Sequence, residues 1–93
     1  MWARIARFDG DPADIDERVE RLRSMLESEG VPPELADAKF LLLVDRESGN
    51  AIGLALFDTE EALHRGDELM NAGPGHAGSR ATVEFYEVPL HTL

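Results

Sequence analysis

The fold is decided by residues 40–57, FLLLVDRESGNAIGLALF, which read as two strands joined by a polar turn. Both predicted strands, 40–44 and 51–57, are apolar at odd and even positions, whereas a strand with one wet face alternates. In the turn, Gly49 or Asn50 can take a positive φ. A hairpin that is apolar on both faces needs cover on both sides. The chain's own helices supply one layer, and we expect a second copy to supply the other.

The chain is short, acidic and free of cysteine. Its 93 residues predict one domain, residues 1–93, which buries only about 60–65% of the unfolded surface. The net charge of -10 repels polyanions, so nucleic acids and anionic membranes are poor partners. The absence of cysteine excludes disulfides and thiolate metal sites. No apolar run is as long as a membrane span and the N-terminus lacks a signal-peptide core, so we expect a cytoplasmic protein.

A strand and an amphipathic helix are predicted before the hairpin. Residues 2–8 are β-prone, and Asp11 is the expected N-cap of a helix that has Pro12 in its first position and stops at Gly30. Arg18 is expected to lie off the centre of the apolar stripe of this helix. The stripe consists of Ile15, Val19, Leu22 and Leu26.

A second helix and a last strand are predicted after the hairpin. Asp58 and Glu61 have the spacing of a capping box, with Asp58 as the cap. The helix continues to about Asn71, a glycine-rich loop follows, and residues 81–88 form the last strand. The apolar stripe of the second helix consists of Ala62, Leu63, Gly66, Leu69 and Met70.

The predicted order is β-α-β-β-α-β, which indicates an α+β ferredoxin-like sandwich with an antiparallel sheet. Right-handed crossovers place both helices on one face of this sheet and leave the other face bare. The strand 40–44 then lies at an edge, where a long apolar strand invites association. Dimerisation through the bare face and this edge covers both surfaces.

Five stretches carry a family resemblance: residues 1–5, 10–12, 42–49, 56–63 and 85–88. Together they resemble the antibiotic biosynthesis monooxygenase-like family, over essentially the whole chain. The resemblance implies a homodimer in which two ferredoxin-like sheets face each other as an α/β barrel, with a cavity between helices and sheet in each subunit. This fold carries several unrelated reactions and also proteins without a known reaction, so the resemblance predicts the fold and leaves the activity open.

The resemblance implies cofactor-independent oxygenase chemistry as one possible activity, in which few side chains hold and deprotonate a phenol or quinol. Such a site needs hydrogen-bonding groups or an arginine beside the developing oxyanion. On this basis Tyr86, Arg4 and His76 are the catalytic candidates, and Trp2 is the substrate-binding candidate. Arg4 shares its strand face with Trp2, so its guanidinium needs either a carboxylate such as Glu84 or an anionic ligand.

Other chemistry finds less support in the sequence. His64 points away from the apolar stripe of the second helix and is expected to face solvent, so neither a haem nor a metal site is predicted. The G-x-G-x-x-G pattern at 73–78 follows a helix and precedes a strand, the reverse of a dinucleotide site, and reads as a connector or lid that carries His76. The acids between residues 9 and 17 are explained by helix capping.

Two hypotheses follow for the function. The first is a dimeric barrel that binds a small aromatic molecule and acts on it as a cofactor-independent monooxygenase. It requires an apolar cavity between helices and sheet into which Arg4 or Tyr86 projects, and it fails if leucines fill that space, namely Leu22, Leu26, Leu63 and Leu69. The second is a non-catalytic homodimeric module with a structural or protein-interaction role. It predicts a packed interior and Arg4 paired with a carboxylate.

Overall fold

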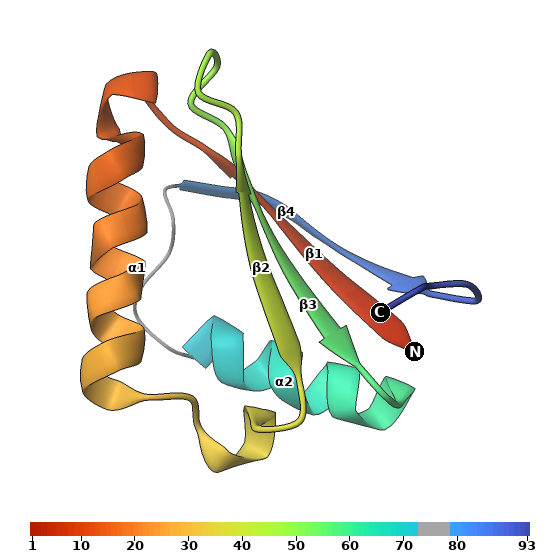
Figure 1. Cartoon of the computed structure of the whole chain (residues 1–93). Coiled ribbons are helices and arrows are strands. Elements are labelled where there is room, and N and C mark those ends of the chain that lie inside the picture. The colour runs from red at the N-terminus through yellow and green to blue at the C-terminus, as the bar shows by residue number, and fades with distance from the viewer. Residues whose placement is uncertain (73–78) are drawn as a thin grey trace.

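The computed structural model describes residues 1–72 and 79–93 and shows a small α+β fold, with four antiparallel strands and two α-helices (Figure 1). The elements are β1 (Trp2–Asp9), η1 (Pro12–Asp14), α1 (Ile15–Glu29), η2 (Pro33–Leu35), β2 (Lys39–Val44), β3 (Ala51–Phe57), α2 (Glu60–Ala72) and β4 (Ser79–Glu87), where η marks a 3-10 helix. The sheet order is β2-β3-β1-β4. This order confirms the predicted β-α-β-β-α-β chain path, places β2 at an edge, and is compatible with a ferredoxin-like fold.

The strand register divides the sheet into two faces. One cross-strand row contains Phe40, Ala55, Arg4 and Phe85. The adjacent row contains Leu41, Leu54, Ile5 and Glu84. We call the side of the first row the helix face, because Arg4 contacts α2 there, and the side of the second row the open face. Figure 1 shows both helices on the helix face.

The buried core of the helix face forms two clusters. The first consists of Ala6, Phe8 and Ala51, with Leu22 of α1 and Val83 of β4 packed against it. The second consists of Leu35, Ala55, Phe57 and Leu63, with Trp2, Ala38, Ala62 and Met70 packed against it. The clusters therefore join α1 and α2 to different ends of the same face.

The buried side of α1 differs from the predicted stripe. Arg18 is buried and donates from Nη2 to the Gly49 carbonyl oxygen at 2.6 Å, whereas Leu26 is 52% exposed. The apolar pattern placed Arg18 off the centre of the stripe and did not predict its burial. The long side chain of Arg18 lets its guanidinium reach a backbone carbonyl of the hairpin turn. A charged residue therefore occupies a buried position of α1 for which the apolar pattern alone predicts a leucine.

The hairpin turn packs against the loop that follows β1. Gly49 has φ 85°, which confirms the predicted positive φ, and a Cβ at this position would collide with Gly10 O and with Pro12 N. Arg46 adds an ion pair across the same contact, with Nη1 3.0 Å from Asp16 Oδ1. The tip of the hairpin is thereby held on the first turn of α1.

The caps observed at two helix N-termini differ in part from the predicted caps. Asp11 is a cap as expected, accepting a hydrogen bond from Ala13 N at 2.9 Å, but it caps η1, and α1 follows. Thr59 rather than Asp58 caps α2, because its Oγ1 accepts from Ala62 N at 3.1 Å. Within the described part of the chain, neither helix has the length and apolar character required to cross a membrane.

Candidate functional site

Arg4 is the centre of a buried polar contact between β1 and α2. Arg4 is 5% exposed, and its Nε donates to Asp67 Oδ1 at 2.8 Å. The two terminal nitrogens also donate to α2, Nη1 to Met70 Sδ at 3.2 Å and Nη2 to Asn71 Oδ1 at 3.3 Å. Every guanidinium nitrogen is thus engaged by a side chain of the same helix.

Of the two alternatives expected for Arg4, a carboxylate partner is confirmed, but it is Asp67 of α2, and the example Glu84 of the last strand was wrong. Glu84 pairs in the register with Ile5, so it lies on the open face. Asp67 was missed, although the sequence holds a signal: it follows buried Leu63 by four residues, so α2 presents both on one side. A carboxylate within an apolar helical stripe indicates a cation opposite it.

Trp2 lies on the helix face beside Arg4, as the strand pattern predicts. It is half-buried and packs against the cluster around Phe57. Phe57 is also its partner in the β1–β3 register. The position therefore serves the core at this end of the sheet.

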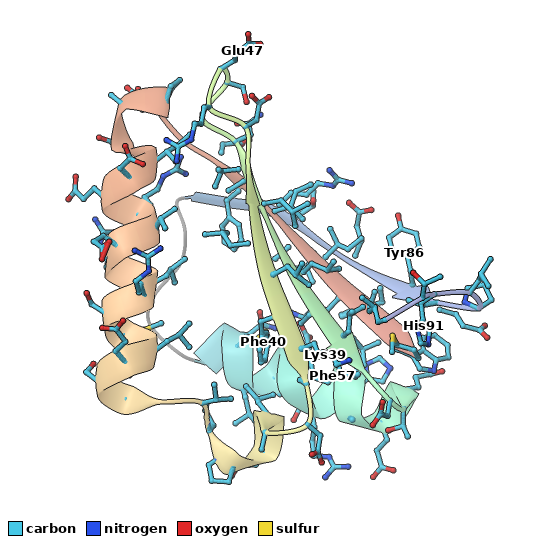
Figure 2. The ribbon with its side chains drawn as sticks, in the orientation of Figure 1. Lys39, Phe40, Glu47, Phe57, Tyr86 and His91 are labelled. Carbon is cyan, nitrogen blue, oxygen red and sulfur yellow. The ribbon has the colours of Figure 1, made fainter. Side chains whose placement is uncertain are left out.

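A second polar cluster lies on the open face, where Glu84 accepts from two neighbours. Arg7 Nε donates to Oε1 at 2.7 Å, and Tyr86 Oη donates to Oε2 at 2.5 Å. The hydrogen bonds from Tyr86 and Arg7 lower the pKa of Glu84, and the bond to Glu84 raises the pKa of Tyr86. Figure 2 shows Tyr86 directed away from the ribbon, on the side remote from α1.

These two clusters do not form one catalytic site. Arg4 faces the helices and Tyr86 faces away from them, so the sheet separates the two candidates. The hydrogen bond to Glu84 raises the pKa of Tyr86, which suits the phenol as a hydrogen-bond donor. His76 lies outside the described residues.

His64 lies on the exposed side of α2, as predicted. Its Nε2 is 3.6 Å from Glu60 Oε1, and its ring meets the ring of Phe85 edge-on with 5.7 Å between centroids. The side chain is nevertheless more than half exposed. Across residues 1–72 and 79–93, no group of three or more histidine, aspartate or glutamate side chains is placed to hold a metal ion.

Two open grooves on the described residues lie apart from Arg4 and Tyr86. One, of about 410 Å³, crosses the hairpin end of the open face, and its lining includes Leu43, Ile52, Arg7 and Thr82. The other, of about 300 Å³, lies where η2 meets the start of α2, over Phe57 and Ala62. Neither groove is lined by Trp2, Arg4 or Tyr86.

No protein-family model matches the sequence, and a search of curated proteins finds no relative. The resemblance to the antibiotic biosynthesis monooxygenase-like family therefore stays a prediction.

Proposed function

We propose that this chain is a non-catalytic homodimeric module in which the open faces of two copies pack against each other as an α/β barrel. The observation that carries the proposal is the apolar open face, on which Leu41 and Leu43 are 49% and 46% exposed with Leu54 and Ile5 beside them. A contiguous exposed apolar surface of this kind is typical of an association site. The family resemblance supports the same arrangement.

The distribution of charge favours the open face as the contact. Each copy has a net charge of -10, so most surfaces of two copies repel each other. Among the residues that pair with Ala3–Arg7 in the register, Glu84 is the only acid, and Arg7 neutralises it. This face can therefore approach its own copy without bringing acids together.

The contacts of Arg4 support a module without catalysis. An oxyanion-stabilising arginine must have donors directed at the substrate. Here all three nitrogens donate to α2, with Asp67 as the charged partner. Holding α2 on β1 accounts for this residue.

The test of self-association uses light scattering across a range of concentrations. The wild type should give about twice the 10.3 kDa chain mass at micromolar concentration. Leu54→Glu should raise the dimer dissociation constant at least about a hundredfold, because each copy would bury an unpaired charge. Leu26→Glu is the matched control, since Leu26 is an exposed leucine of α1 away from the open face. A monomeric wild type at this concentration overturns the proposal.

Binding of a small aromatic molecule at the helix face is a second candidate function. The specific observation is that Leu26 and Leu69, two of the four leucines expected to fill this side, are 52% and 38% exposed, whereas Leu63 is buried and Leu22 packs against the core. Dihydroxynaphthalene is a suitable probe, with the fluorescence of Trp2, the only tryptophan, as the readout. Saturable quenching supports binding. Oxygen uptake that Tyr86→Phe abolishes would overturn the non-catalytic conclusion.

A further inference from the structure

The edge strand β2 has more apolar surface than face-to-face packing covers. All of its residues are exposed, and Phe40, Leu42 and Val44 lie on the helix face, away from the proposed barrel interior. Its outer edge pairs with no strand among the described residues. Natural edge strands are usually protected by charges, proline or a bulge, and β2 carries only Lys39. The edge itself is therefore open to pairing with another strand.

We infer that β2 pairs antiparallel with β2 of a second copy, with Leu42 on the two-fold axis. This inference rests on the proposed dimer and specifies which strands join the two sheets. We call this pair, β2 with the partner's β2, the seam. The symmetry fixes the register. Because Leu42 lies on the axis, the numbers of two residues that face each other always add up to twice 42. Opposite pairs are Lys39 with the partner's Asp45, Phe40 with the partner's Val44, Leu41 with the partner's Leu43, and Leu42 with itself.

The segment 39–45, KFLLLVD, is complementary to itself in this register. Opposite charges meet at both ends, and an aromatic residue meets a β-branched one, two kinds of cross-strand pair that stabilise antiparallel strands. If the two-fold axis passed through Leu41 instead, Lys39 would face the partner's Leu43 and both charge pairs would be lost. Charge complementarity therefore selects Leu42 as the centre.

The ends of the strand are arranged to suit this pairing. Figure 2 shows Lys39 near one end of the hairpin and Glu47 at the other, beyond Asp45. Asp45 Oδ1 accepts from Glu47 N at 3.0 Å, which orients the carboxylate and helps to lower its pKa. Asp37 and Glu47, the next acids outward, lie in turns outside the strand.

One symmetry axis serves the seam and the barrel together. Residues opposite each other in an antiparallel pair point to the same side, so the helix faces of both copies stay outside and the open faces stay inside. The joined sheet then curls over its open face, as a barrel requires. Leu41 and the partner's Leu43 lie inside, and Phe40 and the partner's Val44 lie outside.

A charge swap tests this seam. Lys39→Asp alone and Asp45→Lys alone each replace two attractive pairs by two repulsive ones, and each should raise the dimer dissociation constant about tenfold. An equimolar mixture of the two variants restores opposite charges at both ends and should regain wild-type affinity. Asp45→Asn controls for the turn, because its side-chain oxygen can still accept from Glu47 N. Unchanged self-association of both variants overturns the seam.

Symmetric cross-linking tests the register independently, because the chain contains no cysteine. Leu42→Cys places two thiols on the axis, where opposite Cα atoms are about 4.5–5.5 Å apart and a disulfide fits. Oxidation should therefore yield a covalent dimer. Leu41→Cys is the control, since its two copies are offset by about two residues along the strands, beyond disulfide reach.

The two proposals fail in distinguishable ways. A wild-type monomer overturns the dimer and the seam together. A dimer that Leu54→Glu dissociates, but that shows neither the charge-swap effect nor cross-linking of Leu42→Cys, overturns the seam alone. Cross-linking of Leu41→Cys in place of Leu42→Cys shifts the axis and overturns the register.

Discussion

Two arginines of β1, Arg4 and Arg7, form ion pairs of nearly equal length on opposite faces of the sheet. Nε of Arg4 is 2.8 Å from Asp67, and Nε of Arg7 is 2.7 Å from Glu84. Their surroundings differ, since the side chain of Arg4 is 6% exposed and that of Arg7 is 50% exposed. Contact distance alone therefore does not say which pair matters to the fold.

The difference lies in what replaces each partner when it is lost. Water solvates Arg7 if Glu84 is removed, so the exposed pair contributes little to stability. The buried guanidinium of Arg4 has no such substitute, and losing one side of the pair leaves an uncompensated charge or acceptor. The helix face is committed to structure, whereas the open face can exchange solvent for a partner.

The largest expected effect is that of Arg4→Ala, which should lower the free energy of unfolding by about 3–5 kcal/mol. The substitution leaves Asp67 as a half-buried carboxylate without its cation and removes three hydrogen bonds to α2. Urea unfolding followed by the fluorescence of Trp2 measures the loss. Arg7→Ala is the matched control on the same strand and, at a protein concentration where both variants are monomeric, should leave the unfolding curve nearly unchanged. Equal losses for the two variants would contradict the comparison.

Replacing both members of the buried pair should cost much less than removing one. Arg4→Met with Asp67→Leu fills a similar volume with apolar atoms, and such exchanges are often neutral or stabilising by about 1–4 kcal/mol. The double variant should therefore recover most of the stability lost in Arg4→Ala. A double variant as unstable as Arg4→Ala would mean that Met70 and Asn71 depend on the guanidinium for their own packing.

The sequence predicted the parts of the fold that depend on hydrophobic period and on turn chemistry. The unbroken apolar runs identified the hairpin, and its turn residues limited the positive φ to Gly49 or Asn50, of which the structure has Gly49. The order of helices and strands then required β2 to lie at an edge. These features follow from local patterns, which a single chain carries in full.

The arrangement of buried charges was harder to predict. Arg18 and Asp67 read as surface residues by composition, yet Arg18 reaches Gly49 O and Asp67 reaches Arg4. Both contacts join segments more than thirty residues apart and depend on the rotation of a helix about its axis. Long polar side chains decide that rotation together with the leucines, so an apolar stripe alone misplaces it.

The pH dependence of the exposed pair should be small and confined to acid. Because the pKa of Glu84 is lowered from 4.5 by Tyr86 and Arg7, its contribution to stability is present above pH 4.5. It is lost as the pH falls through the lower folded pKa. The difference in unfolding free energy between wild type and Glu84→Gln should therefore appear at neutral pH and vanish in strong acid. A difference that persists in acid would assign it to packing rather than charge.

The smallest effect is spectroscopic and concerns Tyr86, the only tyrosine of the chain. Its hydrogen bond to Glu84 raises its pKa above 10.0, so phenolate absorbance of the folded protein should rise at higher pH than in urea. The matching contribution to stability is present below pH 10.0 and is lost as the pH rises through the folded pKa. Glu84→Gln removes the charged acceptor and should shift the titration back toward the ordinary value. Identical midpoints for wild type and Glu84→Gln would show that the phenol does not donate to this carboxylate in solution, and would leave Arg7 as the partner that lowers the pKa of Glu84.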